Sequence, residues 1–174
     1  KMQQIQKLRH EIFERQLNYC DEKLVEIKDL FMSEYFKMLM KHIGNNDDGK
    51  IHPSFRNYRM MVDLMLNNCI KERTFKPSMR QNHLLELTLE TWESYIDHKV
   101  NTTIALIKRD YDDNYPDDSV VPRKDVDESN ERVFEKIKPM IISMYRRARE
   151  ISVEISHKIE TVEKEIDNAF KTDN

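Results

Sequence analysis

The chain has 174 residues, of which 35% are charged and 39% hydrophobic, and its formal net charge at pH 7 is −3. It contains two glycines and five prolines, too few for the tight turns and bulges of a strand-rich fold. The abundance of Leu, Met, Glu and Lys favours helix instead. The small net charge argues neither for nor against nucleic acid or a membrane surface as a partner.

The first predicted helix covers residues 2–43, which contain no glycine or proline. Its apolar residues recur at alternating intervals of three and four positions, as one face of a helix requires. They are Leu17, Cys20, Leu24, Ile27, Phe31 and Met38. The apolar face widens after Leu30, which predicts one neighbouring helix at the start and several at the end. Gly44 to Gly49, with four Asn and Asp residues between them, supply a helix stop and a turn.

The second predicted helix covers residues 54–73 and follows Pro53, a residue tolerated in a first helical turn. Apolar side chains in 60–62 and 64–66 cover nearly its whole circumference. We therefore expect it to be the most buried element, with its methionines filling the core. Pro77 then separates it from a third helix over 78–111, where Ser78 and Gln81 have the spacing of a capping box. Trp92 falls on the apolar stripe of this helix and is expected in the core.

Residues 110–128 hold eight carboxylates against only two basic residues, Arg123 and Lys124. Pro116 and Pro122 also lie in this segment. The composition predicts a solvated acidic loop over 112–128 that acts as a linker. An interaction segment for a basic partner is the alternative. If it is a linker, deletion of 112–124 should leave stability nearly unchanged.

The fourth predicted helix covers residues 129–170 and follows a heptad pattern that slips by one residue after Ile155. Pro139 should kink it near residues 135–139. Short connections make neighbouring helices antiparallel. The sequence therefore predicts an all-α, elongated antiparallel four-helix bundle that occupies 1–174 as a single domain. Its long first and last helices should form a coiled-coil-like stem from about 1–20 and 155–174.

No pattern in the sequence predicts a catalytic residue, a metal site or a cofactor. The two glycines flank one turn, which excludes a P-loop and a dinucleotide fingerprint. Residues 46–51 share part of a calcium-binding loop pattern, but the alignment puts Gly44 and Phe55 where carboxylates are needed. That turn is expected to end a helix. Glu154 and His157 match a di-iron signature once, without a second copy, and are interpreted as surface residues.

Cys20 and Cys69 each lie on an apolar stripe and are expected to be small buried hydrophobes, with a disulfide between them as the alternative. Asn101 begins a glycosylation sequon, a short pattern common by chance. No stretch has the roughly 20 apolar residues of a membrane span, and no signal peptide is visible. We expect an intracellular protein, cytoplasmic or nuclear. Because the first residue is Lys1, we also expect the chain to be part of a longer protein.

The favoured function is a non-enzymatic protein–protein interaction or scaffolding domain that binds protein partners or self-associates. The alternatives are a secreted four-helix ligand and a helical domain that binds membranes or nucleic acid. Basic residues are the predicted partner-binding positions, in two groups. One group is Arg146, Arg147 and Arg149, and the other is Lys71, Arg73, Lys76 and Arg80. The competing interpretation is a solvated face whose charges pair with nearby Glu. No small-molecule substrate is predicted.

Overall fold

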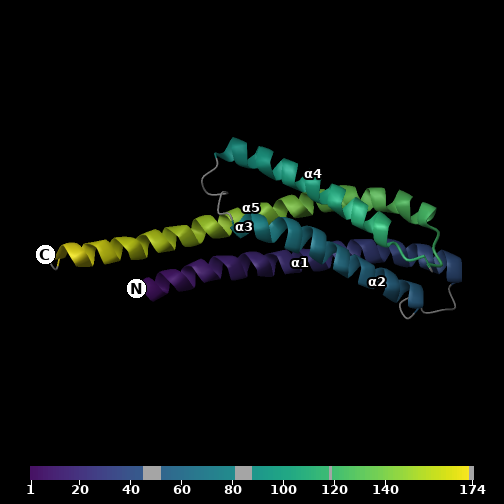
Figure 1. The fold of residues 1–174 in the computed structure, drawn as a ribbon, viewed down its shortest axis with the longest axis horizontal. Helices are drawn as coiled ribbons and strands as arrows, with labels where there is room; N and C mark the ends of the chain where they lie inside the picture. The colour runs from purple at the N-terminus through teal and green to yellow at the C-terminus, as the bar shows by residue number, and fades with distance from the viewer. Residues whose placement is uncertain (45–51, 81–87, 118, 173–174) are drawn as a thin grey trace.

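The computed structural model describes residues 1–44, 52–80, 88–117 and 119–172, and every regular element in this part of the chain is helical (Figure 1). The elements are α1 (Met2–Ile43), α2 (Pro53–Leu66), the π-helix η1 (Asn67–Phe75), α3 (Lys76–Arg80), α4 (Leu89–Asn114) and α5 (Arg123–Thr172). The predicted all-α bundle with long first and last helices is confirmed.

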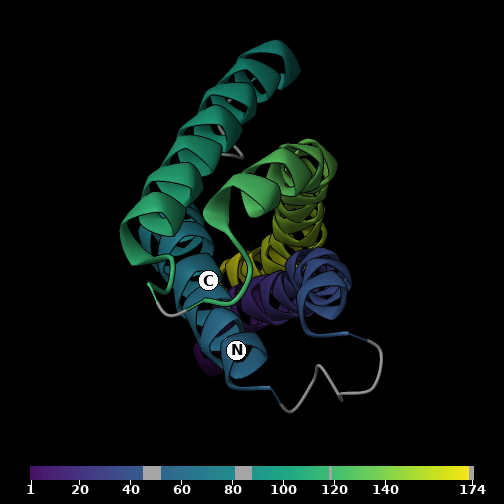
Figure 2. The ribbon, with the colours of Figure 1, turned by 90° about the vertical axis from the view of Figure 1, so that its right-hand side faces the viewer.

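The rods form a ring in the order α1, α5, α4 and α2, as the end-on view shows (Figure 2). Along each adjacent pair, side-chain contacts move forward in one helix as they move backward in the other, so each pair is antiparallel. The contacts are Lys1–Glu165 and His42–Asp125 for α1 and α5, Lys28–Asp63 and Asp21–Lys71 for α1 with α2 and η1, Tyr111–Tyr58 and Tyr95–Ser78 for α4 with α2 and α3, and Lys108–Phe134 and Trp92–Arg149 for α4 and α5.

The predicted stem is confirmed. The start of α1 and the end of α5 extend together beyond the other helices, with both termini at that end (Figure 1). Lys1 Nζ lies 3.6 Å from a Glu165 carboxylate oxygen, and Arg15 lies 3.4 Å from Glu154. Ile5 of α1 is buried in this region. Residues 173–174 of the predicted stem lie outside the described part of the chain.

Gln16 is a buried polar residue in the α1–α5 seam, at the base of the stem. Its Nε2 donates to the Ala148 carbonyl and to Ser152 Oγ, both at 2.8 Å. Replacing Gln16 with Ala removes both bonds, and we expect the free energy of unfolding to fall by about 1–2 kcal/mol. Urea titration followed by circular dichroism would measure this. Gln3→Ala, an exposed position on the same helix, is the control, and an equal loss in both variants would contradict the prediction.

The second rod extends further than predicted. α2, η1 and α3 follow one another without a break from Pro53 to Arg80, so the prediction of an end at residue 73 was wrong. A proline ring clashes with the carbonyl four residues earlier in an α-helix. Here the π-helix ends at Phe75, and Pro77 is the second residue of α3. We infer that the wider π-helical turns accommodate the proline ring, so that the helical path continues past Pro77. Thr74 Oγ1 donates to the Cys69 carbonyl across one of these turns at 2.6 Å.

The predicted start of the third helix at residue 78 was also wrong. Ser78 is buried inside α3, where its hydroxyl donates to the Thr74 carbonyl at 2.8 Å. α4 begins instead at Leu89, where Thr88 Oγ1 accepts from the Thr91 amide at 3.3 Å. Residues 81–87 lie outside the described part of the chain, as do residues 45–51, which include all but Gly44 of the predicted turn. Before that turn α1 ends as predicted, at Ile43, with Gly44 at a φ of +84°.

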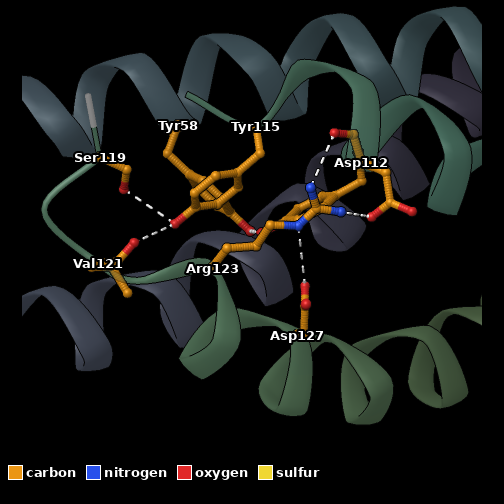
Figure 3. Close-up of polar contacts among 8 residues, drawn as sticks. Tyr58, Asp112, Tyr115, Ser119, Val121, Arg123 and Asp127 are labelled. Atoms are coloured by element: carbon orange, nitrogen blue, oxygen red, sulfur yellow. Dashed lines mark hydrogen bonds and ion pairs between the residues drawn. The ribbon is translucent and has the colours of Figure 1, made fainter. Parts of the chain in front are cut away.

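The predicted acidic loop over 112–128 is too long: its two ends are helical, and only the connection between Asn114 and Arg123 lies outside the helices. α4 continues to Asn114 and α5 begins at Arg123, with acidic Asp125 in its first turn, where the helix dipole favours negative charge. The remaining connection is anchored to the core (Figure 3). The Tyr115 hydroxyl donates to the Val121 carbonyl at 2.8 Å, and Val121 is buried. The average charge of the segment hides buried Val121 and Val126, which hold it against the core.

Arg123 links the two ends of the same connection at the protein surface. Its guanidinium pairs with Asp112 at the end of α4 and with Asp127 in α5, the latter at 3.8 Å (Figure 3). All three side chains are substantially exposed, so the pairs contribute little to stability.

We expect Val121→Ala to lower the free energy of unfolding by about 1–3 kcal/mol, because it removes buried apolar volume. Arg123→Gln should change it by less than about 1 kcal/mol. Thermal denaturation of both variants tests this order. If Arg123→Gln were the more damaging substitution, the ion pairs would be the main anchor of the connection. By the same reasoning, deletion of 112–124 should destabilise the fold strongly.

α5 runs from Arg123 to Thr172 and includes Pro139. Buried Val126 extends the apolar stripe of Val133, Ile137 and Ile141 upstream of the predicted start at residue 129, in keeping with the earlier start of the helix.

Candidate interaction surface

The predicted basic residues are largely engaged within the chain. Lys71 lies 2.6 Å from Asp21, and Lys76 lies 2.8 Å from Glu72. Arg147 pairs with Glu150 at 3.1 Å. These are the local pairs that the competing interpretation of a solvated face predicts.

The other basic residues are not brought together into one surface. The Arg149 guanidinium lies over the buried Trp92 ring at 5.1 Å, so it covers the core. Arg73 and Arg146 are exposed on different rods, and the side chain of Arg80 lies outside the described part of the structure. Tyr145 faces Phe75 of η1 in the core, and one helical step of roughly 100° turns Arg146 away from that contact.

Both cysteines are buried free thiols, as the favoured sequence interpretation expected. Burial raises the pKa of each thiol to about 12, and the nearby Asp110 carboxylate adds to the effect on Cys69. The Cys69 thiol donates to Asp110 at 3.5 Å. Both therefore remain protonated near neutral pH, a state with little nucleophilic or metal-binding reactivity.

Glu154 and His157 lie on the surface of the stem. Glu154 pairs with Arg15 across the seam, which lowers the pKa of its carboxyl group, and His157 lies 3.8 Å from Glu160 on its own helix. Among the residues that the structure describes, no group of three or more His, Cys, Asp or Glu side chains has the arrangement of a metal site.

The outward side of α2 carries large exposed apolar side chains. Met60 and Leu64 expose 63% and 70% of their surface, and Val25 of the adjacent α1 exposes 59%. The predicted second helix, 54–73, does have a larger buried share than the described parts of α1, α4 or α5, as expected, but it is not buried on every side. α2 packs against α1 on one side and α4 on the other, and its third side is open. Met60 and Leu64, which belong to the apolar runs that cover nearly the whole helix circumference in the sequence, lie on that open side.

Two concavities border these residues and make the surface continuous across three helices. One, of about 530 Å³, lies between α2 and α4, and Met61, Leu64 and Met65 contribute to its lining. The other, of about 270 Å³, lies between α2 and α1, and Leu24, Val25 and Leu66 contribute to its lining. Asn67 borders both. We call the surface formed by Val25, Met60, Leu64 and these two concavities the α2 face.

Uncharged residues predominate around Met60 and Leu64 on α2. The positions three or four residues from Met60 or Leu64 include three asparagines, Asn57, Asn67 and Asn68, and one exposed cation, Arg56. Asp63, at the α1 edge, is neutralised by Lys28 at 2.8 Å. Sequence reasoning missed this surface, although the signal was present: a second uncharged stripe, offset from the core stripe of Tyr58, Val62, Met65 and Cys69.

Comparison with known proteins gives no relative: no family model matches the chain, and neither a curated protein nor a solved structure is significantly similar to it. None of the described helices has an apolar stretch long enough to cross a membrane.

Proposed function

We propose that the chain is a non-enzymatic interaction domain that binds a protein partner through the α2 face. The observation that carries the proposal is the exposure of Met60 and Leu64 at consecutive turns of one helix, beside two concavities with partly apolar linings. Single exposed apolar residues are ordinary, whereas a contiguous group framed by polar residues marks a contact surface. Burial of these side chains by a partner would stabilise the complex by about 25 cal/mol for each Å² of apolar surface removed from water.

Two further observations support the proposal. The π-helix η1 begins at Asn67, directly at the border of the face, and such segments are frequent at functional sites because their conformational cost must be offset. The buried free thiols fit a reducing compartment, which supports a cytoplasmic or nuclear location over secretion. A scaffolding role would add a second contact surface, for which the long α1–α5 stem offers length.

Site-directed photo-crosslinking in the cells that make the protein tests the proposal. A photoreactive residue at position 64 should give a saturable product with a defined protein, and the same residue at position 153, exposed in the stem, should not. Met60→Gln should reduce the product at position 64 without changing the helical circular dichroism signal. Identical products from positions 64 and 153, or none that saturates at 64, would contradict binding through the α2 face.

A further inference from the structure

The lining of the concavity between α2 and α4 is partly apolar and partly polar. Met61, Leu64 and Met65 are its apolar lining, which we call the floor. The amides of Asn67, Asn68 and Asn114 and the carboxylate of Asp110 are its polar lining, which we call the rim. Methionine side chains adapt to differently shaped apolar partners, and side-chain amides can both donate and accept hydrogen bonds. The floor therefore suits an apolar ridge, and the rim suits polar groups beside that ridge.

The direction of the groove follows from the helices that border it. α2 and α4 are antiparallel neighbours, with Tyr58 near Tyr111 and Cys69 near Asp110. A groove between two such rods runs along both of them. An extended depression of this kind accepts a third helix, whose side chains at intervals of three and four residues fall into it.

The α4 edge of the groove is negatively charged. Asp110 lies on the rim, and exposed Asp113 follows it one helical turn later. Neither forms an ion pair with a described residue; Asp110 accepts hydrogen bonds from the Cys69 thiol and the Asn114 amide instead. Exposed Arg109 is adjacent in sequence but pairs with neither carboxylate. At the opposite edge of the α2 face, Asp63 is already neutralised by Lys28.

From this arrangement we propose that the α2–α4 groove binds an amphipathic helix of another protein whose apolar ridge is flanked by Lys or Arg. The inference rests on the proposed function and assigns a chemical class to the partner. Leucine-like residues at positions i, i+3 or i+4, and i+7 of that helix contact the methionine floor. Its basic residues face Asp110 and Asp113, which steer the encounter and select the orientation of the helix.

The preference of the groove for a basic amphipathic helix can be measured with two synthetic peptides. Each has leucines at positions i, i+3, i+4 and i+7 of a helix, with lysines flanking the leucines in one and glutamates in the other. Fluorescence anisotropy with the full chain should show at least a tenfold lower Kd for the lysine peptide. Leu64→Asn should raise that Kd at least tenfold, and Asp113→Asn should raise it by about two- to fivefold and reduce its salt dependence. Phe170→Asn and Glu163→Gln, exposed in the stem, are the matched controls and should leave it unchanged.

Equal binding of the two peptides, or binding that Leu64→Asn leaves intact, would overturn the proposal. So would a sedimentation mass of two chains that Leu64→Asn restores to one, because a second copy would then be the occupant. Failure of this proposal would not by itself contradict the proposed function. If position 64 crosslinks saturably to a partner segment that is acidic or not helical, the α2 face remains a docking surface and only the basic helix is excluded.

Discussion

Tyr58→Ala is expected to lower the free energy of unfolding by about 3–5 kcal/mol, a large fraction of the stability of a domain of this size. The Tyr58 ring is fully buried and stacks on Tyr35, with ring centroids 3.8 Å apart and an interplanar angle of 6°. The rings of Tyr111 and Tyr115 meet it edge-on. Removal of the ring leaves a cavity where α1, α2, α4 and the 115–122 connection meet, and the stacked ring of Tyr35 loses its partner.

Urea unfolding followed by the fluorescence of Trp92 would measure the loss, because this buried side chain is the only tryptophan. Tyr58→Phe keeps the ring but removes the oxygen that accepts the Tyr111 hydroxyl at 3.1 Å, and should cost about 1–3 kcal/mol. Phe170→Ala, an aromatic residue 69% exposed at the end of the stem, should cost less than about 0.5 kcal/mol. If Tyr58→Ala were as mild as Phe170→Ala, the aromatic cluster would not be a central part of the core.

The second large effect is loss of stability at alkaline pH. Burial raises the pKa of Tyr58, Tyr111 and Tyr145 well above the usual value, and it raises that of Tyr115 to about 12. An unfolded tyrosine loses its proton near pH 10, whereas the folded chain keeps these four protons to higher pH. Their contribution to stability is therefore complete below about pH 10 and declines as the pH rises above it, by about 1.4 kcal/mol per tyrosine per pH unit.

A chain with a typical stability of about 5–15 kcal/mol should therefore unfold within a few pH units above 10. Tyrosinate absorbance and Trp92 fluorescence should change together, since ionisation requires opening of the core. Tyr145→Phe is the matched variant, because the buried Tyr145 hydroxyl has no hydrogen-bond partner within bonding geometry among the described residues. It should alter the free energy of unfolding at pH 7 by less than about 1 kcal/mol. Above pH 10 the free energy of unfolding of this variant should fall less steeply, by about 1.4 kcal/mol per pH unit, because one buried tyrosine is missing. Tyrosine ionisation completed before any loss of helix would contradict the prediction.

The sequence predicted the long helices well and the breaks between them poorly. α1 is correct to the residue because nothing within 2–43 competes with helix and Gly44 supplies the stop. Pro77 and Ser78 were misinterpreted because a local rule was applied at each, whereas a π-helical segment lets the chain pass both. The acidic connection was misinterpreted because Tyr115, Val121 and Val126 pack against the core there, and an average over the neighbouring carboxylates hides them.

The candidate surface was less predictable than the fold. Apolar residues around a whole helix indicate burial on every side only if neighbouring helices occupy every side, and a linear pattern does not place those neighbours. In a ring of four rods each helix contacts two others, so the outer stripe of α2 with Met60 and Leu64 remains open. Of the predicted basic residues, Lys76 and Arg147 pair with Glu residues on the same helical path, as the sequence spacing allows, whereas the Lys71–Asp21 pair joins positions distant in sequence and could not be predicted from it.

The pairing of α1 with α5 has a consequence for the nascent chain. Contacts such as Gln16 with Ala148 and Ser152 join positions more than 130 residues apart. On a ribosome, α1 is complete long before its main partner exists, so its seam stays open until the last third of the chain has emerged. These distant contacts raise the contact order, so we expect slower folding than in a bundle closed by successive hairpins. Until then the exposed seam offers a transient binding site to chaperones.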